Sequence, residues 1–236
     1  MKTIIRSFVL LFILSFVSAL NVSAQQTIFN VPSSDILDKG KFYIEFDATF
    51  KPNEGDSVGR FSSFVPRIIA GTGGDVEVGL NVTGNIQPGS DSTTLVPAIK
   101  WRPYKNDKGW SVVVGDNIFI PVRNKSCNIG NYAYAQVSKS FKSGTRLTAG
   151  GYHFTKNVVA ASDRAGGQFG FEQTVNKYLN INADWYTGKH AAGYFTPGVA
   201  YKPHPKVTGY VGYSIGNTNV RGGNHFVYAA IGINLN

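Results

Sequence analysis

The chain has 236 residues, a formal net charge of +9 and a single cysteine. One cysteine cannot form an internal disulfide, so a small secreted scaffold stapled by such bonds is excluded. The basic residues are scattered singly, with no basic helix, zinc-ligand spacing or aromatic RNA-binding signature, so nothing supports nucleic-acid recognition. The many Gly, Tyr and Phe residues favour strands and tight turns.

The first 24 residues predict a secretory signal peptide. Lys2 and Arg6 precede an apolar run at 8–17, and small residues lead up to Ala24. The run is too short to cross a bilayer as a mature helix, which needs about 20 apolar residues. We expect Sec-type export and cleavage after Ala24, with an N-terminal membrane anchor as the less favoured alternative.

Residues 25–40 form a separate piece with little alternation of apolar and polar residues. One interpretation is a periplasmic lead-in to the following domain. The other is a partial plug, in which Ile28, Phe29 and Leu37 tuck into the mouth of a barrel.

From residue 41 to the end, apolar and polar residues alternate with a period of two, which predicts strands with one apolar and one polar face. In 41–50, for example, Phe42 and Ile44 face one way while Tyr43 and Glu45 face the other. Each of about twelve strands is roughly ten residues long, the length that a tilted strand needs to cross a bilayer. The predicted strands are 41–50, 60–70, 75–83, 93–102, 110–120, 131–141, 145–155, 167–175, 179–185, 193–202, 206–215 and 225–235.

The connections between these strands alternate in length along the chain. Short turns on one side and longer loops on the other are typical of an outer-membrane barrel with both termini in the periplasm and an even number of strands. The sequence therefore predicts an all-β fold, a closed antiparallel up-and-down transmembrane β-barrel of about twelve strands over residues 41–236. Tight turns are expected near 71–74, 142–144, 176–177 and 202–205, a moderate one at 102–109, and longer loops at 51–59, 85–92, 121–130, 155–166, 187–192 and 216–224.

This pattern resembles the bacterial outer-membrane β-barrel proteins as a class, over essentially all of residues 41–236. The final stretch, 227–236, is similar to the last strand that the barrel assembly machinery recognises, although it ends on Leu235-Asn236 where such strands usually end on an aromatic residue. The resemblance implies an outer-membrane location, with membrane lipid and the assembly machinery as partners. No specific named family is indicated.

Aromatic residues gather near the predicted strand ends. Amphipathic rings prefer the boundary between membrane and water, so these residues are candidates for two interfacial girdles. The alternative is that they are core aromatics of a soluble barrel. The candidates are Trp101, Tyr104, Trp110, Trp185 and Tyr186.

Some residues fit this pattern poorly. Pro66, Pro97 and Pro197 fall inside predicted strands, where we expect local bulges or displaced boundaries because proline removes a ladder donor. Lys139 and His153 fall on the face assigned to lipid.

Six charged residues on the polar faces of the first four strands are predicted to line the lumen. They could form a salt-bridged network that fills the interior, or a charged constriction that selects solutes by sign. Inward glycines, among them Gly170, Gly198 and Gly212, would leave space inside. The charged candidates are Glu45, Asp47, Arg67, Glu77, Lys100 and Arg102.

An enzyme is not predicted. The four histidines lack the spacing of a metal site, and the chain contains neither a Gly-x-Ser-x-Gly elbow nor the His-x-Ser-Asn-Gly stretch of outer-membrane phospholipases. We therefore expect no metal and no cofactor.

The function predicted is a narrow, porin-like passive channel or a structural component of the envelope. Small hydrophilic solutes are the expected cargo, and the excess of positive charge favours anionic ones. Two alternatives remain open at this level. One is a secreted soluble barrel that binds an apolar ligand, with apolar residues inward; the other is a surface barrel whose loops bind a partner.

Overall fold

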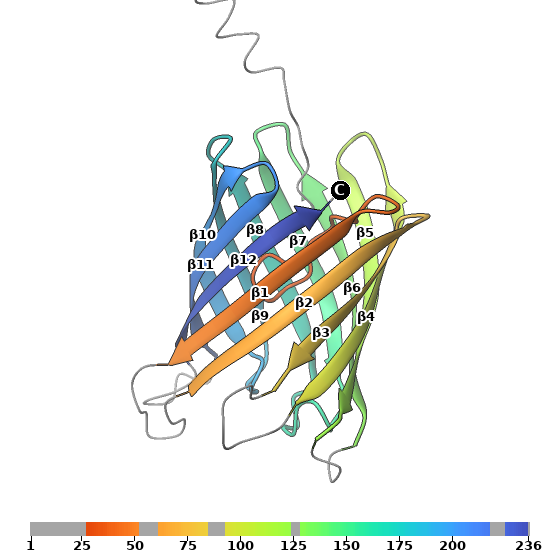
Figure 1. Ribbon diagram of the computed structural model, residues 1–236, viewed down its shortest axis with the longest axis vertical. Coiled ribbons are helices and arrows are strands. Elements are labelled where there is room, and N and C mark those ends of the chain that lie inside the picture. The colour runs from red at the N-terminus through yellow and green to blue at the C-terminus, as the bar shows by residue number, and fades with distance from the viewer. Residues whose placement is uncertain (1–26, 52–60, 85–92, 124–127, 218–224, 236) are drawn as a thin grey trace, which may run out of the picture.

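The computed structural model describes residues 27–51, 61–84, 93–123, 128–217 and 225–235. Its twelve strands close into one antiparallel barrel (Figure 1), which confirms the predicted fold. Every strand end lies within three residues of its predicted position. The strands are β1 (Phe42–Lys51), β2 (Phe61–Gly73), β3 (Val76–Thr83), β4 (Thr94–Lys105), β5 (Trp110–Pro121), β6 (Gly130–Ser140), β7 (Thr145–Phe154), β8 (Ala165–Thr174), β9 (Leu179–Tyr186), β10 (Tyr194–His204), β11 (Val207–Gly216) and β12 (Phe226–Leu235).

Each strand pairs with its neighbour in sequence, and β1 closes the barrel by pairing with β12 from Phe42↔Leu235 to Phe50↔Val227. Closure satisfies the backbone groups that a free sheet edge would leave exposed, which is a condition for crossing a bilayer with strands. Within the described residues, no helix is long and apolar enough to cross a membrane.

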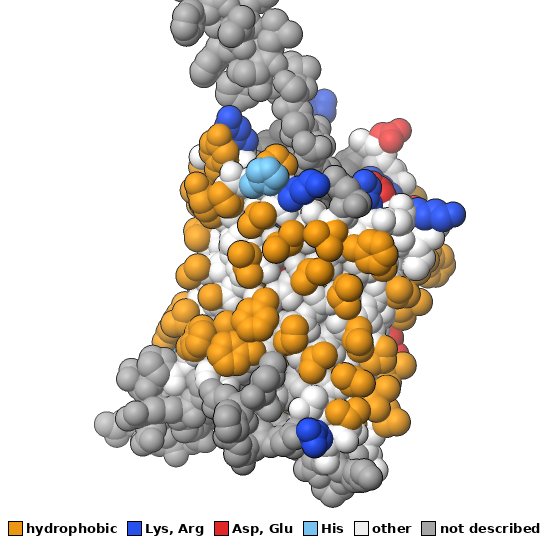
Figure 2. Space-filling view, in the orientation of Figure 1, with side chains coloured by type: hydrophobic (Ala, Val, Ile, Leu, Met, Phe, Trp, Pro, Cys, Tyr) orange, Lys and Arg blue, Asp and Glu red, His pale blue; other side chains and the backbone are white. Residues whose placement is uncertain are grey.

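The barrel is apolar outside and polar inside. On β1, Phe42, Ile44 and Phe46 are exposed while Glu45 and Asp47 are buried. Figure 2 shows apolar side chains covering the wall between the two rims, with most of the charged side chains of this face at the upper rim. This polarity is that of a barrel in lipid. It contradicts the soluble alternative, which requires apolar residues inside.

The connections alternate in length as predicted. The short turns, the start of β1 and the end of β12 lie at one end of the barrel, at the top of Figure 1, called here the short-turn end. At the opposite, long-loop end the structure describes the loops 155–164 and 187–193. In barrels of this kind the short turns face the periplasm.

The expected bulges at Pro66, Pro97 and Pro197 are not found. Each proline is paired in an unbroken register on one side, opposite Phe46, Leu80 and Ala183 respectively. A proline removes only the one bond that its N–H would donate, and the flanking pairs keep the register. Register shifts occur instead near the short turns, at Gly71/Gly73, Trp101/Tyr104 and Tyr201/His204.

Lys139 does point outward, as its place in the alternation requires. Its ammonium lies 5.0 Å from the centre of the Trp110 ring and donates to the carbonyl of Lys108 in the β4–β5 turn. The apolar stem thus lies along the wall while the charge reaches the rim. His153 is also on the outer face, directly opposite Ala133 and Ala165 on the adjacent strands.

Candidate functional site: the lumen and its plug segment

Four of the six predicted lumen charges are buried inside the barrel as ion pairs between neighbouring strands. Glu45 and Arg67 stand directly opposite each other on β1 and β2, as do Glu77 and Lys100 on β3 and β4. The Arg67 guanidinium lies 2.8 Å from Glu45, and the Lys100 ammonium lies 2.8 Å from Glu77. Pairing in this register offsets the cost of holding each charge away from water.

The other two predicted charges are also paired. Asp47 lies 2.9 Å from the second nitrogen of Arg67. Arg102 pairs with Asp75 in the β2–β3 turn, a partner that the sequence did not suggest.

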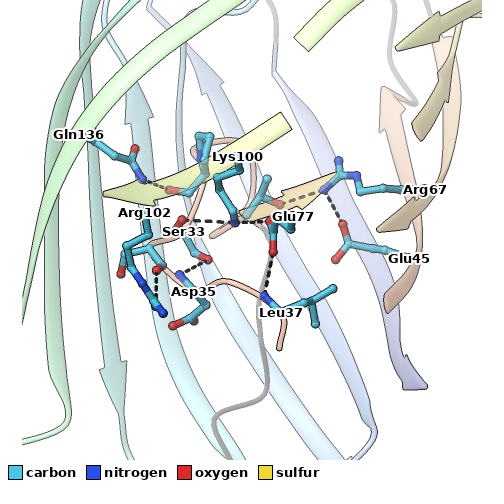
Figure 3. A network of polar contacts seen from close by, with 12 residues as sticks. Ser33, Asp35, Leu37, Glu45, Arg67, Glu77, Lys100, Arg102 and Gln136 are labelled. Atoms are coloured by element: carbon cyan, nitrogen blue, oxygen red, sulfur yellow. Dashed lines mark hydrogen bonds and ion pairs between the residues drawn. The ribbon is translucent and has the colours of Figure 1, made fainter. Parts of the chain in front are cut away.

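Residues 27–38, called here the plug segment, lie within the lumen (Figures 1 and 3). A tight turn at its tip is closed by the N–H of Ile28, which donates to the carbonyl of Val31 over 2.8 Å, and by a bridge between Thr27 and Pro32. Ile28, Phe29 and Val31 are at most 2 % exposed. Of the two interpretations of residues 25–40, this position is the one expected of a plug.

Two apolar side chains of the plug segment fill sockets left by inward glycines. A Cβ added at Gly170 would collide with the end of Ile28, and one added at Gly198 would lie 2.6 Å from the ring of Phe29. Phe29 also packs edge-on against Tyr228, with ring centres 5.5 Å apart. The plug segment occupies the space beside Gly170 and shares the space beside Gly198 with the backbone of β11, whose Val211 carbonyl an added Cβ would also meet.

Other inward glycines are covered by wall side chains. The hydroxyl of Tyr134 lies over Gly115, and that of Tyr43 lies over Gly232. The wall itself thus narrows the lumen.

One carboxylate of the wall holds the tip of the plug segment. Asp184 on β9 accepts the backbone N–H groups of Phe29, Asn30 and Val31 over 2.9, 2.5 and 2.7 Å. This one buried oxygen thus accepts three N–H groups that the tight turn would otherwise leave unpaired.

Wall side chains also bind the backbone after the tip. Gln136 donates to the carbonyl of Pro32 over 2.6 Å. Lys100 and Arg102 donate to the carbonyls of Ser33 and Ser34 over 3.5 and 3.3 Å, and the N–H of Leu37 donates to Glu77 over 2.9 Å (Figure 3). Glu77, Lys100 and Arg102 therefore bind the backbone of the plug segment, and Arg67 donates to the hydroxyl of Thr27 over 3.3 Å.

Asp35 of the plug segment lies in a basic environment. Arg146 on β7 lies 2.7 Å from Asp35 and also pairs with Glu172 on β8. Burial alone would raise the pKa of Asp35, but Arg146, Lys100 and Arg102 outweigh it and hold that pKa below its usual value. Asp35 is therefore ionised at neutral pH, and its charge helps to hold the segment.

Beyond the tip, the lumen contains an aromatic cluster of Tyr132, Tyr134, Tyr152, Phe154 and Tyr186. The girdle assignment was wrong for Tyr186: it is 5 % exposed, whereas Trp185 is 41 % exposed. Successive residues of a strand face opposite sides, so Trp185 and Tyr186 cannot both face lipid. The remaining candidates, Trp101, Tyr104 and Trp110, point outward.

The described loops at the long-loop end pack onto this cluster. Val159 of the β7–β8 loop is buried in it, and Nε2 of His190, in the β9–β10 loop, lies 2.7 Å from the Tyr152 hydroxyl. Nδ1 of His190 accepts the N–H of Ala192, which requires the neutral tautomer protonated on Nε2. Burial lowers the pKa of His190 and outweighs the opposing effects of Asp163 and Thr187.

A cavity of about 120 Å³ remains between the plug segment and the wall formed by β2–β6. Its lining is mixed: amides of Asn30, Asn81 and Asn117 lie beside charged Arg67 and the ring of Tyr132. It is a small space of mixed polarity next to the ion pairs.

The residues that sequence reasoning missed are Gln136, Arg146, Glu172 and Asp184. All four lie on inward positions of β6–β9, whereas the predicted lumen charges lie on the first four strands. The same alternation would have found them, since Asp184 lies between the outward-facing residues Ala183 and Trp185.

No protein-family profile matches the sequence, and no curated protein matches it. Solved structures do match its fold. The NanC porin superposes with a TM-score of 0.55 at 9% identity, covering 83% of this chain and 99% of that one. The KdgM porin, solved in complex with disordered oligogalacturonate, gives 0.54 at 11% identity, covering 82% and 98%.

The Salmonella typhi outer-membrane phospholipase dimer gives a TM-score of 0.50 at 12% identity, covering 85% of this chain and 92% of that one. Porins and a phospholipase thus share this architecture, so the fold alone does not select a function. Together with the apolar outer wall, the comparisons show that this chain has the fold of the bacterial outer-membrane β-barrel proteins.

Proposed function

We propose that the protein is a narrow passive channel of the outer membrane for small hydrophilic solutes, closed in this state by the plug segment. The observation that carries the proposal is that the lumen is lined by paired charges and amides and is obstructed by a separate segment. Single hydrogen bonds and ion pairs hold much of that segment, and water can replace each of them at modest net cost.

The side chains around Asp35 favour anionic solutes. Arg146, Lys100 and Arg102 all stabilise its carboxylate. If the plug segment withdraws, these three cations lose one anionic neighbour, and a passing anion would take its place. We propose a modest preference for small anions.

The test is single-channel recording in planar bilayers of the wild type and the double variant I28G/F29G. Removing both apolar side chains empties the glycine sockets, so we expect rare, brief openings in the wild type and long-lived openings in the variant. The reversal potential in a salt gradient should show anion preference, reduced by Arg146→Gln. A variant that folds, by its heat-dependent gel shift, yet conducts no more than the wild type would contradict the proposal.

A structural role in the envelope is the second candidate, because the wall side chains of the aromatic cluster also fill the lumen. In that case, I28G/F29G should unfold at a lower temperature without conducting. The third alternative is a barrel whose loops bind a partner. Much of those loops lies outside the described residues, namely 52–60, 85–92, 124–127 and 218–224.

Enzymatic activity is not proposed. His153 lies on the outer face, where it is a candidate acid–base group. Directly opposite His153 are Ala133 and Ala165, which carry no nucleophile. Among the residues that the structure covers, no three His, Cys, Asp or Glu side chains are grouped to hold a metal.

We propose that the chain reaches the outer membrane by Sec-type export with removal of residues 1–24, which lie outside the described residues. Strand β12 would serve as the signal for the assembly machinery, with membrane lipid covering the apolar wall. Exchange of Leu235 and Asn236 for charged residues should reduce insertion, measured by membrane fractionation.

A further inference from the structure

The wall of the lumen recognises the main chain of its occupant more than its side chains. Asp184 accepts three consecutive N–H groups, from residues 29–31. Gln136, Lys100 and Arg102 then donate to three consecutive carbonyls, from residues 32–34. Every polypeptide carries these groups, so none of the six contacts depends on the identity of the occupant's side chains.

Fewer polar contacts reach the side chains of the segment: Asn30 donates to Thr196, and Thr27 accepts from Arg67. The sockets at Gly170 and Gly198 receive Ile28 and Phe29, and Arg146 receives the carboxylate of Asp35. An occupant therefore needs two adjacent large apolar residues, a tight turn, and an acidic residue six positions after the second apolar one.

We propose that the lumen is a binding site for a polypeptide segment, occupied here by residues 27–38, and that it accepts a peptide of the same pattern supplied from outside. The wall presents one acceptor to three successive N–H groups and then three donors to the three carbonyls that follow, an arrangement that matches a main chain and that a site for small ions or sugars would not need. The proposal goes beyond channel activity because it concerns binding, whether or not the barrel conducts.

The experiment uses the full chain in detergent micelles and a fluorescein-labelled twelve-residue peptide with the sequence of residues 27–38, followed by fluorescence anisotropy. In the wild type the site is occupied by the chain itself. In I28G/F29G the built-in segment lacks its two apolar anchors, so the free peptide should bind about tenfold more tightly than to the wild type.

Matched carboxylates of the wall provide the control. Asp184→Asn, added to I28G/F29G, should weaken peptide binding about tenfold, because charge-assisted bonds to three N–H groups are lost. Asp116→Asn on the same background should leave binding within about twofold, because Asp116 accepts from Asn131 on β6 and not from the plug segment. A peptide with glycine at both apolar positions should not bind at the same concentrations.

Each variant is first checked for folding by its heat-dependent gel shift, and F29G alone replaces the double variant if the latter does not fold. Equal peptide affinity for wild type and I28G/F29G, or full binding after Asp184→Asn, would overturn the proposal. Because no current is recorded, this result is separate from the conductance test: a barrel that conducts but does not bind peptide refutes only the inference made here.

Discussion

Gly170 shows how one missing side chain can determine what fills the lumen. Its lack of a Cβ makes room for the terminal methyl group of Ile28, and the next nearest atom, Cβ of Thr148, is farther away at 3.3 Å. The missing side chain at Gly170 therefore makes room for the plug segment more than for residues of the adjacent strands.

Gly170→Ala should therefore loosen the plug segment by about 1–3 kcal/mol, the usual cost of overpacking. Ile28→Ala in the same chain should recover most of that loss, because the shorter side chain leaves space for the new methyl group. The measure is amide hydrogen exchange of residues 27–38 in both single variants and the double variant. Additive effects would mean that the two side chains do not share a socket.

At the residue scale, sequence reasoning is strongest where alternation determines the direction of a side chain. Glu45, Arg67, Glu77 and Lys100 follow from period two along their strands. It failed for Tyr186, because proximity to a strand end was used without regard to the face on which the residue lies. The partners of Asp35 and Asp184 could not be predicted, since they depend on how an irregular segment folds back into the barrel.

At the level of elements, the β9–β10 loop should respond to pH through His190. Burial holds the pKa of His190 in the closed loop below its usual value. The neutral form therefore contributes stability above a pH of about 6.5, and this is lost as the pH falls through the lowered pKa.

Protection of residues 187–193 from hydrogen exchange should accordingly fall on acidification. His190→Gln keeps a polar side chain but does not titrate, and it should remove the pH dependence. The same acid-induced loss in His190→Gln would show that another group is responsible.

The plug segment should respond at lower pH through Asp35. Its pKa is lowered in the folded protein, so its contribution is complete above its usual pKa and is lost as the pH falls through the lowered value. Exchange of residues 27–38 should rise under those conditions in the wild type. Asp35→Asn should show weaker protection already at neutral pH and no further loss on acidification; an unchanged wild-type profile would contradict this.

The strands were predictable because period-two alternation and turn residues act locally, and every strand end was located within three residues. The position of the plug segment was not predictable, since residues 25–40 lack alternation and their hydrogen-bond partners are spread over β2, β3, β4, β6, β7, β9 and β10. Local propensity carries no information about contacts so distant in sequence.

For the whole molecule, the outward tryptophans predict how the barrel sits in lipid. Trp101 and Trp110 lie at the short-turn end and Trp185 at the long-loop end, all more than 40 % exposed. In bilayers of brominated lipids, we expect quenching of tryptophan fluorescence to be strongest with bromine near the headgroups and weaker with bromine at the chain ends. Strongest quenching at the bilayer centre would contradict the placement of these rings at the two interfaces.

The most direct test of a channel closed by its own plug segment is to lock and release that segment in one molecule. The side chains of Asn30 and Thr196 are hydrogen-bonded over 3.1 Å, so cysteines at both positions, in an I28G/F29G background with Cys127→Ser, can be joined by a short reducible linker. We predict no current while the linker is intact and sustained conductance after reduction, reversibly. Equal currents in the locked and released states would contradict the account.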